Sequence, residues 1–348
     1  MDSDLENAAA NLVAGVPVVS VTPLYCLVTD EDEIRLSDAI SITRFSEEQL
    51  GFLAEFTNFV GHLRLYPPQC LLWERNSVSL RHFVTMAKEL HSISKDRLGE
   101  INEGDLVRSY ASSTPAMFPV MDSLVVLIRA FQLYRRGRLV VGDSFFSFTT
   151  PFPAGFMARC TEMTVDYQVM EQYEPSYEFN STDVEDFKSF LAAFIEAHQT
   201  INKYPELQLA IARYCKETAQ HGDVIDLMIA LEALLVAEEE GIVFKLSQRV
   251  ANLLGADATS RKELFHKIRD FYSLRSKMVH GGKPKPKELK AQEQLDDLRE
   301  IARRVILSVI VLARDVGVGQ KLSALLNDMC LDDDLRRATQ EKVSALLR

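Results

Sequence analysis

An arginine and a histidine near the end of a predicted helix are the residues best suited to do chemistry. They are Arg275 and His280, five positions apart, and Ser276 places a hydroxyl beside the arginine. An imidazole titrates near neutral pH, so it can take a proton from a ribose 2′-hydroxyl or give one to a leaving 5′-oxygen. A guanidinium can bind a phosphate through two hydrogen bonds and stabilise the charge of the transition state. Together these groups fit RNA cleavage without a metal ion.

Positioning this pair requires the helix to end at the histidine. On a continuous helix, a spacing of five residues would turn the two side chains about 140° apart. Gly281 and Gly282 follow His280 directly and are expected to end the helix there, which lets the imidazole turn back toward the guanidinium. The alternative is a surface arginine and a helix-terminal histidine, because this spacing also occurs by chance.

A basic segment surrounds the pair in an otherwise acidic chain. Residues 261–290 contain ten Lys or Arg and three Asp or Glu, a charge of +7, whereas the whole chain carries −11 and the remainder therefore −18. A phosphate-binding site on an acidic protein requires such a local excess of positive charge. The candidate RNA-binding residues are Lys277, Lys283, Lys285 and Lys287. The alternative is that 283–287 is only a solvated loop, kept extended by its prolines.

Length and composition favour a cytoplasmic protein of more than one domain. The 348 residues suffice for two or three domains, and a 47% hydrophobic content allows a sizeable core. Five dispersed cysteines favour reduced thiols over a disulfide framework or a zinc site. The acidic start and the short apolar runs predict neither a signal peptide nor a membrane span. The N-terminal half contains no P-loop, dinucleotide-binding turn, nucleophile elbow or metal motif, and we expect no cofactor and no metal.

Hydrophobic periodicity predicts an α+β domain at 1–180 and an all-α antiparallel helical bundle at 181–348, with its core at about 203–318. Predicted strands in the first half are Val18–Val28, Glu33–Leu36, Ile40–Arg44, Leu71–Arg75, Leu139–Phe148 and Met163–Met170, with helices at 46–60 and 117–134. Predicted helices in the second half are 182–200, 207–215, Val224–Glu239, Phe244–Leu254, Arg261–Val279, 295–316, 320–329 and 333–347. A capping box from Thr182 to Glu185 is expected to open the first of these helices.

Three segments of the second half resemble the Apea-like branch of the HEPN superfamily. They are Asp223–Leu235, Leu246–Leu254 and Phe271–Gly281, and they match in order and at suitable spacing. The resemblance implies a HEPN-like bundle of four to five helices that dimerises so that two Arg-x(4–6)-His motifs face each other. It also implies a metal-independent ribonuclease of the kind used in toxin–antitoxin systems and antiviral defence.

Carried onto this chain, the resemblance would make Arg275 and His280 the catalytic pair of a homodimer that acts on RNA. The N-terminal domain would then sense a trigger or bind a protein partner. The chain departs from the family pattern at Ser276, where active members usually have Asn, Asp or His. Because non-catalytic HEPN domains that bind nucleotides or partners also exist, such a module is the alternative function.

Glu232 lies within an otherwise apolar predicted helix, where an unpaired carboxylate would destabilise the fold. We therefore expect it to be largely buried and to have a partner. The first candidate is an ion pair with Arg249, and the second is a contact with Arg275 or Ser276 on the motif helix. In the second case Glu232 would support the site by orienting the arginine.

Overall fold

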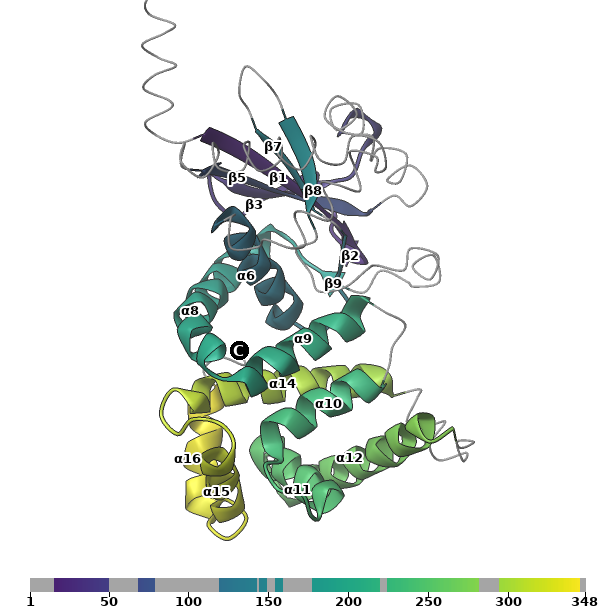
Figure 1. The fold of residues 1–348 in the computed structure, drawn as a ribbon, viewed down its shortest axis with the longest axis vertical. Helices are drawn as coiled ribbons and strands as arrows, with labels where there is room; N and C mark the ends of the chain where they lie inside the picture. The colour runs from purple at the N-terminus through teal and green to yellow at the C-terminus, as the bar shows by residue number, and fades with distance from the viewer. Residues whose placement is uncertain are drawn as a thin grey trace, which may run out of the picture. The chain divides into compact units, whose positions relative to one another are not determined.

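The computed structural model describes residues 16–49, 68–78, 119–142, 144–148, 154–158, 177–219, 224–281 and 294–344 (Figure 1). They form two compact units. The first comprises the described residues up to Ile128 together with Arg138–Lys188, and the second comprises Arg129–Gly137 and the chain from Ser189 onward. The first unit holds an antiparallel sheet and the second is largely helical, which confirms the predicted order of an α+β half followed by an all-helical half.

Among the described residues, the first unit contains a seven-stranded sheet in the order β3–β4–β5–β1–β7–β8, with β6 also paired to β1. All of these pairs are antiparallel. The strands are β1 (Val16–Tyr25), β3 (Glu33–Arg35), β4 (Ile40–Arg44), β5 (Cys70–Val78), β6 (Val140–Val141), β7 (Ser144–Phe148) and β8 (Ala154–Ala158). A separate parallel pair joins β2 (Leu27–Val28) to β9 (Tyr177–Glu178).

The predicted strands Glu33–Leu36 and Ile40–Arg44 are confirmed as β3 and β4, which pair as a hairpin with Ile34 opposite Ile42. The single strand predicted over 139–148 is wrong, because the chain forms β6 and β7 with Gly142 between them. A Cβ on Gly142 would lie 3.2 Å from Pro23 and from Tyr25 of β1, and its N–H donates to the Pro23 carbonyl. Strand β8 has no counterpart among the predicted strands. The predicted strand at 163–170, the start of the helix at 117 and most of the helix at 46–60 lie outside the described residues.

The central strand β1 carries two buried hydroxyl groups, on Ser20 and Thr22, that form hydrogen bonds to residues of neighbouring strands. Thr22 and Ser144 share a hydrogen bond of 2.7 Å. The Glu74 carboxylate accepts hydrogen bonds from Ser20 at 3.5 Å and from Ser123 at 3.2 Å. Burial raises the pKa of Glu74 to about 7, and these two hydrogen bonds oppose the rise. The buried polar groups therefore pair across strands β1, β5 and β7 and to the helix that holds Ser123.

The second unit is built from helices, most of them joined by short connections. The described helices are α6 (Pro119–Tyr134), whose last residues belong to this unit, α8 (Val184–Lys203), α9 (Pro205–Ala219), α10 (Val224–Leu235), α11 (Ile242–Leu254), α12 (Ala258–Val279), α14 (Leu295–Ala313), α15 (Gln320–Asp328) and α16 (Asp333–Ser344). None of the described helices is long and apolar enough to cross a membrane.

Several helix ends differ from their predictions by a few residues, including the start of α8, the end of α10 and the start of α12, which lies at Ala258 and not at Arg261. A short helical turn, η2 (Ser181–Asp183), precedes α8, and the capping pair is Asn180 with Asp183 instead of Thr182 with Glu185. The Asp183 carboxylate accepts the Asn180 N–H at 2.9 Å. The helix α10 ends at Leu235 and not at 239, because the chain turns there toward α11. Apolar residues at a 3-4 spacing along α14, from Leu295 to Leu312, are buried as predicted for an amphipathic helix, whereas Val316, which was predicted to continue the helix, lies beyond its end at Ala313.

The α10 helix is the centre of the bundle and packs against α9, α11, α12 and α14. Its apolar residues are buried on several sides, as its nearly continuous hydrophobic sequence predicts. The motif helix α12 packs against α11 and α10 (Figure 1). The position of α12 therefore depends on how it leaves α11.

The corner between α11 and α12 is a close approach of two backbones at Gly255. A Cβ at this position would lie 2.7 Å from the Ala251 carbonyl oxygen and 2.9 Å from the Arg261 Cα. Asp257 then begins α12, since its carboxylate accepts the Ser260 N–H at 2.8 Å and its own N–H donates to the Ser260 hydroxyl at 3.0 Å.

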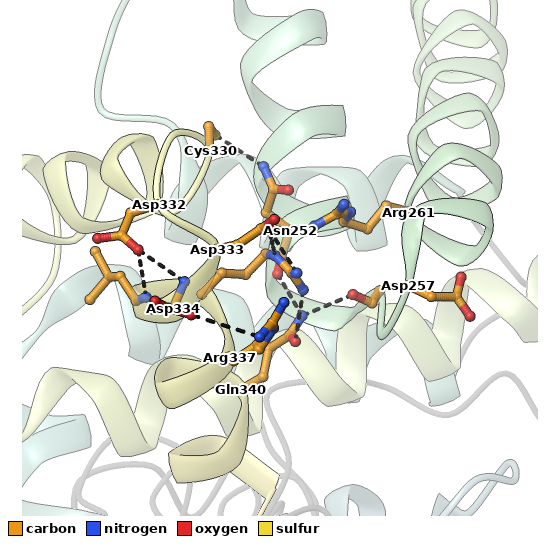
Figure 2. Close-up of polar contacts among 12 residues, drawn as sticks. Asn252, Asp257, Arg261, Cys330, Asp332, Asp333, Asp334, Arg337 and Gln340 are labelled. Atoms are coloured by element: carbon orange, nitrogen blue, oxygen red, sulfur yellow. Dashed lines mark hydrogen bonds and ion pairs between the residues drawn. The ribbon is translucent and has the colours of Figure 1, made fainter.

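The last helix, α16, holds this corner in place (Figure 2). The Gln340 side chain donates to the backbone carbonyls of Asn252 and Gly255 at 2.8 and 3.0 Å, so it satisfies acceptors that the end of α11 leaves free. Arg261 of α12 pairs with Asp333 at the start of α16 at 3.3 Å. The α12 helix is thus fixed at its N-terminal end by polar contacts far apart in the sequence.

Gly255→Ala is expected to lower the free energy of unfolding by about 1–3 kcal/mol, because a methyl group there has no space. Urea denaturation monitored by circular dichroism measures the effect. Ala256→Ser, at the exposed neighbouring position, is the control and should change the free energy of unfolding by less than about 0.5 kcal/mol. An alanine variant as stable as the wild type would show that the corner does not need glycine.

Candidate functional site

The C-terminal end of α12 places His280 on the surface. The helix ends at Val279, and His280 caps it by donating its backbone N–H to the Ser276 carbonyl at 3.1 Å. Gly281 follows with φ of +69°, a left-handed conformation that favours glycine. The His280 side chain is exposed. The predicted glycine stop is confirmed.

Arg275 and Glu232 come together between α12 and α10. The distance from Arg275 Nη2 to Glu232 Oε2 is 3.7 Å, and the two side chains are 23% and 22% exposed. The guanidinium also lies over the Tyr272 ring, with its Cζ 5.7 Å from the centroid. Glu232 of α10 therefore forms an ion pair with the motif arginine. This is the second of the two partners that we expected for Glu232 from the sequence.

The contact is an ion pair and not a tight hydrogen bond, because 3.7 Å exceeds the usual donor–acceptor distance. Glu232 Oε1 and Arg275 Nε are both buried, and neither has a hydrogen-bond partner among the described residues. Burial raises the pKa of Glu232, and the positive charge of Arg275 opposes that rise. Glu232 is therefore half-buried with a partner, whereas we had expected it to be largely buried.

The expected partner Arg249 is engaged elsewhere. Its fully buried guanidinium pairs with Glu238 at 2.6 Å and donates to Asn327 of α15 at 2.8 Å and to the Leu235 carbonyl. The hydrogen bonds from Arg249 lower the pKa of Glu238 to about 2. The expectation of a Glu232–Arg249 pair is wrong, because Arg249 faces the end of α10 and not its middle. The only feature of the sequence that could have predicted Glu238 as the partner of Arg249 is the run of three glutamates, 238–240, that follows α10.

The structure does not join Arg275 to His280 directly. Within the described part of the chain, no hydrogen bond, ion pair or ring contact links the two side chains. Five residues of helix turn them about 140° apart, so Arg275 faces α10 while His280 lies at the open end of α12. The imidazole and the guanidinium therefore do not bond to each other.

The remaining predicted site residues divide into two groups. Ser276 and Lys277 are half-buried on the last turn of α12. Lys283, Lys285 and Lys287 lie outside the described residues. Among the described residues, no group of three or more His, Cys, Asp or Glu side chains is arranged to hold a metal ion.

Part of the positive charge of the motif helix is neutralised by acids from other helices. Lys267 pairs with Asp297 of α14 at 2.7 Å, in addition to the pairs that Arg261 and Arg275 make. Lys262 and Arg269 are exposed and form no ion pair with any residue that the structure describes. Among the described residues of this segment, the charge available to a ligand is therefore smaller than the sequence count, and its unpaired cations Lys262 and Arg269 lie on the exposed side of α12.

Comparison of the sequence with protein-family models and with curated proteins, and of the structure with solved structures, found no match.

Arg275→Met is expected to raise the pKa of Glu232 further, since the variant keeps the apolar volume but removes the charge that opposes the effect of burial. Carbon-detected NMR titration of the glutamate carboxyls measures this pKa. The pKa of Glu238 is the internal control and should stay at about 2, because its partner is Arg249. An unchanged Glu232 pKa would contradict the ion pair.

Proposed function

We propose that this chain is a HEPN-type, metal-independent RNA endonuclease that acts as a homodimer. The observation that carries the proposal is the end of α12, where a glycine-terminated helix exposes His280 five residues beyond Arg275, which pairs with Glu232. General acid–base groups and a guanidinium are what cleavage by an internal hydroxyl needs.

The proposed reaction uses the ribose of the substrate as its nucleophile. A His280 imidazole takes the proton of the 2′-hydroxyl, and the 2′-oxygen attacks the adjacent phosphorus. The bond from phosphorus to the 5′-oxygen breaks, and an imidazolium returns a proton to that oxygen. The products are a 2′,3′-cyclic phosphate and a 5′-hydroxyl. Arg275 contacts the phosphate, and Glu232 is a positioning residue for the guanidinium.

A dimer supports this chemistry because one chain supplies a single imidazole at the site. Two motifs related by a two-fold axis would supply both a base and an acid, with two arginines for the phosphate. Met278 and Val279, next to His280, are 39% and 50% exposed. These side chains give the end of α12 apolar surface for a contact between subunits, which must offset the repulsion between two basic helices. The sheet unit would then bind the trigger or partner that controls a defence or toxin activity.

A non-catalytic HEPN module that binds a nucleotide or a partner is the second candidate. The observation that favours it is the pairing of Arg275 with Glu232, which partly neutralises the one arginine of the motif. Ser276 also stands where active members of the family usually have Asn, Asp or His. In this case the motif would stabilise the contact between α10 and α12.

RNA cleavage by the wild type is expected to continue in EDTA, and His280→Ala should reduce the rate by about 10²- to 10⁴-fold, as loss of a general acid–base group does. Gel analysis of a labelled RNA, with identification of the cyclic phosphate end, measures both effects. His198→Ala, on α8, is the control and should cleave at the wild-type rate. Cleavage that EDTA abolishes, or that survives in His280→Ala, would contradict the mechanism.

Light scattering is expected to show a dimer at micromolar concentration that tightens when RNA is added. Val279→Glu should shift the equilibrium toward monomer, because it places a charge in the proposed apolar contact. Leu331→Glu, at a position that is 91% exposed after α15, is the matched control and should leave the dimer intact. A strict monomer, unchanged by RNA, would favour the non-catalytic module.

A further inference from the structure

One side of α12, opposite its buried residues Ile268, Phe271 and Leu274, forms a continuous stripe. Positions 262, 266, 269, 273 and 276 follow the 3-4 spacing of a single helix face, and His280 caps the helix at the end of this stripe. Lys262, His266 and Arg269 are exposed. From Lys262 to His280 the stripe is about 27 Å long, at about 1.5 Å per residue. The candidate catalytic imidazole therefore ends a surface that extends along the whole helix.

The charges on this stripe are available to a ligand. Lys262 and Arg269 form no ion pair with any described residue, whereas Arg261, Lys267 and Arg275 on the packed side are each paired with an acid. The helix thus uses some cations for packing and leaves others to solvent. An exposed row of unpaired cations attracts a polyanion.

Aromatic rings line one edge of the stripe. Phe244 of α11 is 58% exposed, unusual for so large an apolar side chain, and contacts Phe265 edge-to-face at 5.7 Å. Phe265 in turn contacts the exposed His266 ring at 5.7 Å. Tyr272, seven residues further along α12, continues this edge and is half-buried. Together these rings form a discontinuous aromatic surface beside the cations.

The opposite edge carries acids. Glu263 and Asp270 lie about 80–100° around the helix from the centre of the stripe, on the side away from the rings. Phosphates would be repelled there and attracted at the centre. The distribution across the helix therefore runs from aromatic to basic to acidic, which gives a bound strand one preferred orientation.

We propose that this face is a docking track for single-stranded RNA, with unpaired bases stacked on Phe244 and Phe265 and phosphates held by Lys262 and Arg269. The track would hold a strand whose scissile phosphate lies at His280. The choice of RNA as ligand rests on the proposed function. Stacking on exposed rings needs bases that are not paired, so the track selects single strands over duplexes.

The binding test uses the full chain with His280→Ala, so that the RNA stays intact, and a fluorescent oligouridine long enough to span α12. Phe244→Ala is expected to weaken binding by roughly 5- to 100-fold, the range that loss of one stacked base produces. Phe244→Tyr should restore it, because tyrosine keeps the ring. Leu331→Ala is the control for loss of an exposed apolar side chain and should bind as the parent does.

The charge test measures how the binding constant falls with salt concentration. Lys262→Ala combined with Arg269→Ala should reduce the slope of log K against log salt by about 1.4, since each lost phosphate contact on a single strand removes about 0.7. Lys321→Ala, an exposed lysine on α15, should leave the slope unchanged. A duplex of the same length should bind more weakly than the single strand.

Four outcomes would overturn the docking track. Two are that oligouridine does not bind and that Phe244→Ala binds it as tightly as the parent does. The third is that a duplex binds with equal affinity, and the fourth is that the variants change dimerisation but not RNA affinity. The last would make this face a protein interface. If binding follows the expected pattern while the wild type cleaves nothing, the proposed enzyme is wrong and the track stands. If cleavage occurs but the track variants bind normally, the enzyme stands and the track is wrong.

Discussion

The guanidinium of Arg249 has no contact with solvent, and its need for partners organises the helices around it. It donates to the Leu235 carbonyl at the end of α10, to the Glu238 carboxylate and to Asn327 of α15. A buried charge without partners destabilises a fold by several kcal/mol. The α10, α11 and α15 helices must therefore pack where these acceptors converge. Because α12 packs against α11 and α10, its place follows from this interaction.

The corner between α11 and α12 fixes where the motif helix α12 lies relative to the helices around Arg249. Gly255 allows the two backbones to approach, and Gln340 satisfies the carbonyls that the end of α11 leaves free. The result is a helix with one packed side and one open side. Arg275 faces the packed side and pairs with Glu232, whereas His280 caps the helix at its exposed end. The ion pair with Glu232 thus holds the Arg275 guanidinium in place and partly neutralises its charge, while the His280 imidazole stays accessible to solvent.

The same division sorts the charges of α12. Cations on the packed side meet acids from α10, α14 and α16, and this pairing offsets the cost of their partial burial. Cations on the open side, such as Lys262 and Arg269, stay in solvent. An acidic protein can in this way present a small basic surface without a large net positive charge. In the proposed function, this surface and the aromatic edge would guide a single strand toward the imidazole.

The sequence by itself determined the features that depend on neighbours along the chain. The glycine stop of the motif helix, the pairing of β3 with β4 and the buried face of α14 follow from periodicity and capping, which are local. The start of the motif helix was predicted three residues too late, at Arg261 and not at Ala258. Only the tertiary structure decided that Glu232 pairs with Arg275, that Arg249 pairs with Glu238, and that the strand predicted at 139–148 divides into β6 and β7. Each of these depends on which surfaces face each other across long sequence separations. Helix geometry fixes the direction in which each side chain points, but only the packing of the helices decides whether that direction leads to a partner or to solvent.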